Sequence, residues 1–132
     1  TSENEVMGSS SIRSSVETAR DSLSDKIAYL TEFLGGEYER QGVYPAWEYR
    51  KDSPLRDKMV EVYEEMYGQK PNVVAIHAGL ECGLFYKKME GLDCVSLGPD
   101  MKDIHTSEEV LSISSTERVW KYLVKVLEAL KE

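Results

Sequence analysis

The sequence contains little cysteine. Only Cys82 and Cys94 occur in a chain of 132 residues, whereas small secreted domains that depend on disulfides carry several closely spaced cysteines. No spacing of cysteine and histidine resembles a zinc finger. We therefore expect two reduced thiols in a cytoplasmic protein.

The sequence also lacks a basic excess and any long apolar run. Its 16 Lys and Arg against 24 Asp and Glu give a formal net charge of -8. Nucleic acids and anionic membrane surfaces select clustered positive charge, so we expect neither as a partner. No apolar run approaches the roughly 20 residues that span a bilayer. The sequence does not begin with basic residues followed by an apolar core, so we do not predict a secretory signal.

What is present suits a folded chain. With 41% hydrophobic residues the chain has enough apolar side chains for a core, which argues against disorder. Its length predicts one domain or parts of two. The chain begins at Thr1 in polar sequence without a methionine, which is typical of a piece of a longer protein.

The first third of the chain predicts a strand, a helix and a second strand. Residues 5–12 read as a strand, and Ser14 and Glu17 form a capping-box pattern. Gly35-Gly36 then ends the helix, and residues 37–43 read as the second strand. Pro45 breaks this pattern, so we place a domain boundary near Trp47. The helix is indicated by apolar residues spaced three and four apart: Val16, Ala19, Leu23, Ile27, Leu30 and Leu34.

The remainder predicts strands alternating with helices, which defines an α/β fold. Ser53-Pro54 is typical of a helix start and Gly68 of its end. Continuous apolar runs at 73–76 and 94–97 indicate strands buried on both faces. We also expect a short helix over 80–89, a short strand over 110–113, and a last helix whose capping box is 114–117.

Both histidines and both cysteines lie in one quarter of the sequence, between residues 76 and 109. His105 follows a Gly-Pro turn in a polar loop, with Asp103 before it and Glu108-Glu109 after it. A neutral imidazole there could ligate zinc while a carboxylate orients it. The alternative is an exposed loop histidine without a ligand role. His105 alone does not make a site, because zinc takes about four ligands.

A second group of candidates lies at the end of the 73–76 run. Gly79 would let a substrate approach the backbone closely after His77, and amides at the following helix start could hold an anion such as a peptide carboxylate. The alternatives are a hydrogen-bonded strand-end histidine and a Glu81 that only favours the helix dipole. Cys82 beside His77 could be a nucleophile, although a buried thiol behaves as a small apolar group. Arg13 could pair with a carboxylate or remain solvated.

These residues carry a resemblance to a known family. The stretch Ile-His-Ala-Gly-Leu-Glu-Cys-Gly at 76–83, Gly-Leu-Asp at 91–93, Val-Ser-Leu-Gly-Pro at 95–99 and Asp-Ile-His at 103–105 resemble the C-terminal part of bacterial aminoacyl-histidine dipeptidases. These are Xaa-His dipeptidases, also called cytosol non-specific dipeptidases. Residues 9–20 and 42–47 are similar to that family too, so the resemblance covers nearly the whole chain. Two departures occur: Val43 replaces a glycine, and Thr-Ser-Glu-Glu at 106–109 replaces Ser-Pro-Asp-Glu.

The resemblance implies a metallodipeptidase that holds two zinc ions in an α/β catalytic domain and dimerises through an inserted lid. Residues 1–47 would be the end of the lid and 48–132 the last part of the catalytic domain. His105 matches the family's last metal ligand. Arg13 resembles the lid arginine that reaches the substrate carboxylate. The substrate-side motif is matched by His77, Gly79 and Glu81.

The other metal ligands and the carboxylate that activates water belong to an N-terminal half that this sequence does not contain. The resemblance therefore implies a chain that is inactive alone and whose partners are that half, a dipeptide and a second copy. Two alternatives stay open. One is a non-catalytic dimerisation or binding module, and the other is a thiol hydrolase that uses Cys82 and His77.

Overall fold

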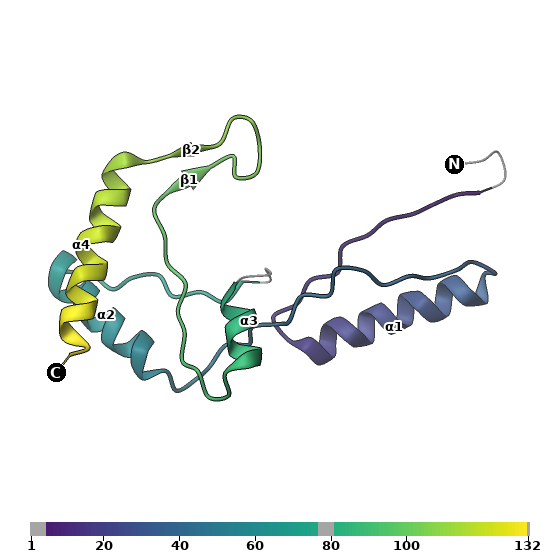
Figure 1. Cartoon of the computed structure of the whole chain (residues 1–132), viewed down its shortest axis with the longest axis horizontal. Coiled ribbons are helices and arrows are strands. Elements are labelled where there is room, and N and C mark those ends of the chain that lie inside the picture. The colour runs from purple at the N-terminus through teal and green to yellow at the C-terminus, as the bar shows by residue number, and fades with distance from the viewer. Residues whose placement is uncertain (1–4, 77–80, 132) are drawn as a thin grey trace. The chain divides into compact units, whose positions relative to one another are not determined.

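The computed structural model describes residues 5–76 and 81–131. The chain divides into two compact units, Thr1–Tyr49 with Ala75–Glu90, and Arg50–Val74 with Gly91–Glu132. The described residues form four α-helices and one two-stranded sheet (Figure 1). The α/β class is confirmed in this coarse sense, as helices combined with a small sheet. The predicted boundary between lid and catalytic domain near Trp47 stays a prediction.

The first unit contains α1 (Glu17–Phe33) and α3 (Glu81–Lys88). The predicted helix over 16–34 is confirmed, and Gly35 with φ 81° follows it in the left-handed conformation that ends helices. The predicted capping box is wrong. Val16 is the N-cap and has no side-chain cap, while the Ser14 hydroxyl accepts the Val16 N–H at 3.1 Å.

The segment after α1 runs back along the helix in extended form (Figure 1). It is held by side chains of α1, because the Ser24 and Tyr38 hydroxyls lie 2.7 Å apart and Arg40 donates to Asp21. The predicted strands at 5–12 and 37–43 are wrong. Neither segment pairs with a strand in the described part of the chain, and Val6 is 98% exposed. A strand needs a hydrogen-bonded neighbouring strand, and the segment 37–43 instead contacts α1 through its side chains.

The second unit is built on α2 (Pro54–Tyr67) and α4 (Ile113–Ala129). Their contact surface holds all four of the buried apolar side chains in the described chain: Met59, Val62, Tyr122 and Val126. The Tyr122 hydroxyl also donates to the Met59 carbonyl oxygen at 2.7 Å, so a buried polar group is satisfied inside the core.

The ends of α2 agree with the prediction from the sequence, whereas the start of α4 does not. Ser53 caps α2 by accepting the Arg56 N–H at 3.1 Å, and Gly68 ends it with φ 68°, as predicted. The last helix begins earlier than predicted, at Ile113. Its N-cap is Ser112, whose hydroxyl accepts the Ser115 N–H at 3.3 Å.

Of the three strands predicted after residue 50, only the short strand at 110–113 is formed, in part. Val110–Leu111 is β2, and it pairs antiparallel with β1 (Met101–Lys102), which the sequence did not predict. The strands predicted at 73–76 and 94–97 are wrong. Val74 is 63% exposed and Ile76 is 50% exposed. An apolar run is buried on both faces only between neighbouring strands and covering helices, and the described residues do not provide them.

Asp93, from the Gly-Leu-Asp motif, closes the N-terminus of α2. Its Oδ1 accepts the Ser53 hydroxyl at 2.7 Å and its Oδ2 accepts the Leu55 N–H at 3.0 Å. Burial raises the pKa of Asp93, but these hydrogen bonds and the charges of Arg50 and Arg56 outweigh it, so the pKa lies below its ordinary value. The carboxylate is thus a structural cap for a helix distant in sequence.

We expect the free energy of unfolding to fall in acid partly through Asp93. A carboxyl group whose pKa is lower in the folded state stabilises the fold fully above its unfolded pKa of about 4, and this contribution is lost as the pH falls through the folded pKa. Asp93→Asn keeps one acceptor oxygen for two donors and should cost about 1 to 2 kcal/mol at pH 7. Urea unfolding at pH 7 and pH 3 measures both effects.

In the Asp93→Asn variant the free energy of unfolding should differ less between pH 7 and pH 3 than it does in the native chain. The exposed Asp57 in the first turn of α2 gives a matched control, because Asp57→Asn removes the same charge without uncapping the helix. An Asp93→Asn variant that keeps the full acid dependence of the native chain would contradict this role.

Candidate metal-ligand loop

Residues 103–109 join β1 to β2 and are all exposed. The loop is closed by pairing of Lys102 with Val110 and by a turn in which Thr106 donates twice to the Asp103 carbonyl oxygen, through its N–H at 3.1 Å and its hydroxyl at 2.6 Å. The same hydroxyl accepts the Glu108 N–H at 3.2 Å. Thr106, one of the departures from the family pattern, therefore stabilises the turn.

His105 lies at the centre of this loop in an unusual backbone conformation. Its φ is 68°, and that of Asp103 is 52°. Side chains with a Cβ adopt this left-handed region at a cost of roughly 1 to 2 kcal/mol. The His105 N–H donates to Glu109 Oε2 at 2.7 Å. Strained backbone of this kind clusters at functional sites, so it favours a role for His105 beyond that of a solvated loop residue.

The loop offers the right kind of ligand for zinc but too few of them. The described residues contain no group of three or more His, Cys, Asp or Glu side chains that could hold a metal ion. An exposed imidazole fits one position of a zinc site. Further ligands would have to come from elsewhere.

The predicted substrate-side residues belong to the first unit, whereas His105 belongs to the second. Arg13 is exposed and its Nε donates to the Ser11 hydroxyl at 3.4 Å. Glu81 is exposed at the first residue of α3. His77 and Gly79 lie outside the described residues. The substrate-side roles of Arg13, His77, Gly79 and Glu81 stay predictions, as does the pairing of Cys82 with His77.

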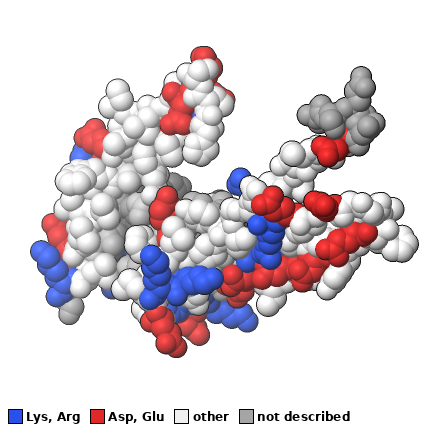
Figure 2. Space-filling view, turned by 45° about the vertical axis from the view of Figure 1, so that its right-hand side comes forward, with Lys and Arg blue, Asp and Glu red and all other residues white. Residues whose placement is uncertain are grey.

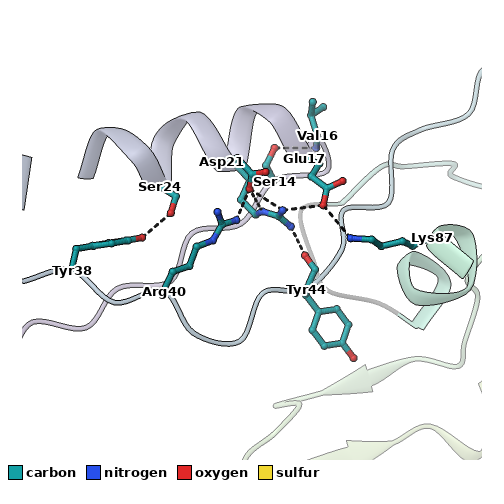
Figure 3. A network of polar contacts seen from close by, with 10 residues as sticks. Ser14, Val16, Glu17, Asp21, Ser24, Tyr38, Arg40, Tyr44 and Lys87 are labelled. Carbon is teal, nitrogen blue, oxygen red and sulfur yellow. Dashed lines mark hydrogen bonds and ion pairs between the residues drawn. The ribbon is translucent and has the colours of Figure 1, made fainter. Parts of the chain in front are cut away.

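Arg20 is an organising residue that the sequence did not reveal. Its side chain is buried, 8% exposed, and contacts Glu17 at 3.1 Å and Asp21 at 2.9 Å. Figure 3 labels both carboxylates. It also donates to the Tyr44 carbonyl oxygen. Burial alone would lower the pKa of Arg20, but the hydrogen bonds and negative charges of Asp21 and Glu17 raise it. A signal was present, since Glu17 and Arg20 are spaced for an i,i+3 ion pair.

This network positions residues 44–47, the Tyr-Pro-Ala-Trp part of a family-like motif. Gly83 of α3 also lies close to these residues, because an added Cβ there would be 2.9 Å from the Pro45 carbonyl oxygen. Only glycine allows that approach. Two motifs that are distant in the sequence, 42–47 and 76–83, therefore meet within the first unit.

The first unit also shows how the acidic charge is distributed. Figure 2 shows acidic side chains over the α1 part of the molecule with basic side chains among them. The ion pairs that join them include Arg40 with Asp21 and Lys87 with Glu17, the latter at 3.8 Å. Hydrogen bonds from Arg40 and Arg20 lower the pKa of Asp21. Arg20, Arg40 and Lys87 are thus engaged with carboxylates.

No family model matches the chain. Individual proteins do, and they are dipeptidases. The chain is 34% identical over 116 residues to the cytosol non-specific dipeptidase of Escherichia coli (strain K12), which is 88% of this chain and 24% of that protein. It also matches the crystal structure of aminoacylhistidine dipeptidase from Vibrio alginolyticus with a TM-score of 0.72 and 36% identity, over 88% of this chain and 24% of that one.

The predicted resemblance to aminoacyl-histidine dipeptidases is therefore confirmed. The chain spans about a quarter of the length of these relatives and is a relative of them over most of its own length. No described helix is both long and apolar enough to cross a bilayer.

Proposed function

We propose that this chain is the C-terminal part of a zinc-dependent dipeptidase that hydrolyses dipeptides such as Xaa-His in the cytoplasm. The observation that carries the proposal is the similarity in sequence and in fold to two dipeptidases over 88% of the chain. The chemistry of the His105 loop agrees with it, because an exposed imidazole is a suitable zinc ligand.

In this proposal the residues of the chain bind and orient. His105 would hold one of two zinc ions, whose chemistry would be to polarise the peptide carbonyl and activate water. Arg13 pairs with the carboxylate of the dipeptide, and His77, Gly79 and Glu81 line the substrate. Arg20 and Gly83 fix the backbone of residues 44–47. The residue that accepts the proton of the attacking water is not among these.

The chain alone is proposed to be inactive, and the rest of a dipeptidase is its partner. Exposed apolar surface on α4 supports a missing partner. One stripe of α4 faces its core, while a second, formed by Ile113, Trp120, Leu123, Leu127 and Leu130 at helical spacing, is exposed. Trp120 is 66% exposed and Leu127 is 53% exposed. A helix that is apolar on two sides is typical of one covered on both.

The experiment that tests the proposal is a chimera in which this chain replaces the matching quarter of the Escherichia coli relative. The chimera should bind zinc and hydrolyse dipeptides, and a chelator should abolish turnover. A folded chimera that turns over dipeptides without bound metal would contradict the zinc mechanism. Inactivation by iodoacetamide with no effect of a chelator would favour the thiol hydrolase instead.

A second candidate function is dimerisation through the lid part, and α1 favours it. Its exposed apolar side chains include Leu23, 49% exposed, Leu30, 60% exposed, and Phe33, 87% exposed. Such an unsatisfied face on a surface helix is typical of an interaction site. It is compatible with the dipeptidase proposal, because the same surface would join two copies of the enzyme.

We expect the chain to dimerise in a concentration-dependent manner through α1. Replacing Leu23 and Leu30 together by serine removes apolar area from the interface and should weaken the dimer about tenfold or more. Light scattering over a concentration series measures the change. The matched control replaces Trp120 and Leu127 by serine on α4 and should leave the dimer intact. A native chain that is monomeric at every concentration would exclude this function.

A further inference from the structure

The loop between β1 and β2 has a feature that a ligand role for His105 does not by itself explain. Both Asp103 and His105 lie in the left-handed region, with φ of 52° and 68°, although neither is glycine. The loop is exposed throughout, so burial does not force this conformation. Hydrogen bonds within the loop hold it, and the bonds from Thr106 to the Asp103 carbonyl oxygen close the turn that contains His105.

Glu109 provides a further contact, made with His105 itself. Its Oε2 accepts the His105 N–H at 2.7 Å, and an N–H bond to a carboxylate is stronger than one to a neutral acceptor. The backbone of Glu109 is itself restrained, because it directly precedes Val110, which pairs with Lys102. The neighbouring carboxylate of Glu108 is placed differently and accepts the Ser107 hydroxyl at 3.3 Å.

We infer that Glu109 is a positioning residue for His105. Its carboxylate links the rigid strand end to the backbone of His105 and keeps the residue in the left-handed conformation from which the imidazole is presented. The inference rests on the proposed role of His105 as a zinc ligand. It assigns to the last residue of Thr-Ser-Glu-Glu a task that needs an acceptor at that position, and needs no contact between Glu109 and the metal.

The test compares three variants of this chain by NMR. Glu109→Ala should accelerate hydrogen exchange of the His105 amide about tenfold and move its backbone coupling constant away from the left-handed value. Glu109→Gln keeps an acceptor oxygen and should restore most of the protection. Glu108→Ala is the matched control and should leave His105 unchanged. The amides of β1 and β2 should exchange as before in all three.

Two results would overturn the inference. One is a Glu109→Ala variant whose His105 exchange and coupling match the native chain. The other is equal acceleration across the loop and both strands, which would mean general loosening of the hairpin. In the chimera, Glu109→Ala should weaken zinc affinity, measured by competition with a chelator, about tenfold, and Glu108→Ala should not.

The chimera also separates the two proposals. If His105→Ala leaves zinc affinity intact, the ligand role fails even where Glu109 fixes the turn. If His105 is required and Glu109→Ala changes neither exchange nor zinc affinity, the ligand role stands and the positioning role fails.

Discussion

His105→Ala is expected to reduce dipeptide hydrolysis by the chimera about a thousandfold or more. A metal ion supplies several kcal/mol of transition-state stabilisation, and each 1.36 kcal/mol is about a factor of ten in rate. Loss of one imidazole from a zinc site of about four ligands should also lower the bound zinc. Turnover and zinc content of the purified protein measure the two effects together.

The fold should survive this change. His105 is exposed, and its structural bond to Glu109 uses the backbone N–H, which alanine retains. The circular dichroism of the variant should therefore match that of the native chain. Glu108→Gln is the matched control in the same loop. A His105→Ala chimera with normal zinc content and full turnover would refute the ligand role.

Tyr122→Ala should have the largest effect on stability, a loss of about 3 to 5 kcal/mol. Tyr122 is 8% exposed, and its ring meets that of Tyr63 edge-on, with centroids 5.5 Å apart. Its hydroxyl donates to the Met59 carbonyl oxygen, and the substitution removes this hydrogen bond. Because the α2–α4 core contains few buried side chains, we expect the second unit to unfold at room temperature. Urea unfolding followed by circular dichroism measures the loss.

Tyr122→Phe separates the two contributions of this side chain. It keeps the ring and removes the hydrogen bond, and should cost about 1 kcal/mol. Tyr29→Ala on α1, a residue that is 71% exposed, is the control and should change little. A loss of less than about 1 kcal/mol in Tyr122→Ala would show that the α2–α4 contact does not hold the unit together.

The helices that were predicted correctly are those whose signals lie close together in the sequence. The helix over 54–67 has Ser53 and Pro54 at its start and Gly68 at its end, and these signals act within one turn of the chain. The helix over 17–33 follows from its apolar spacing. Each of these signals acts without any distant segment.

The failures have a common physical origin. The runs at 73–76 and 94–97 are apolar enough for inner strands, but a strand is defined by its neighbours. The only pairing in the described residues is between β1 and β2. Likewise, α4 begins earlier than predicted because Ser112 is its N-cap and not Ser114, although both residues have a hydroxyl that can cap a helix. Sequence alone does not rank such competitors.

The candidate site was predicted in its residue types but not in its geometry. An imidazole among carboxylates at 103–109 could be read directly from the sequence. The left-handed conformation of His105 and the hydrogen bond from its N–H to Glu109 could not be predicted, because no glycine or asparagine marks the turn. Arg20 was missed because the carbonyl oxygen that it contacts lies 24 residues away.

The two units are stabilised by different forces, and this has a consequence for how the chain responds to its surroundings. In the described part of the first unit the buried polar and charged side chains are Arg20 and Ser24, whereas the buried apolar side chains all lie in the second. Ion pairs are screened by dissolved ions, while burial of apolar surface is not. Rising ionic strength should therefore loosen the exposed pairs of the first unit, Arg40 with Asp21 and Lys87 with Glu17, and leave the α2–α4 pair packed.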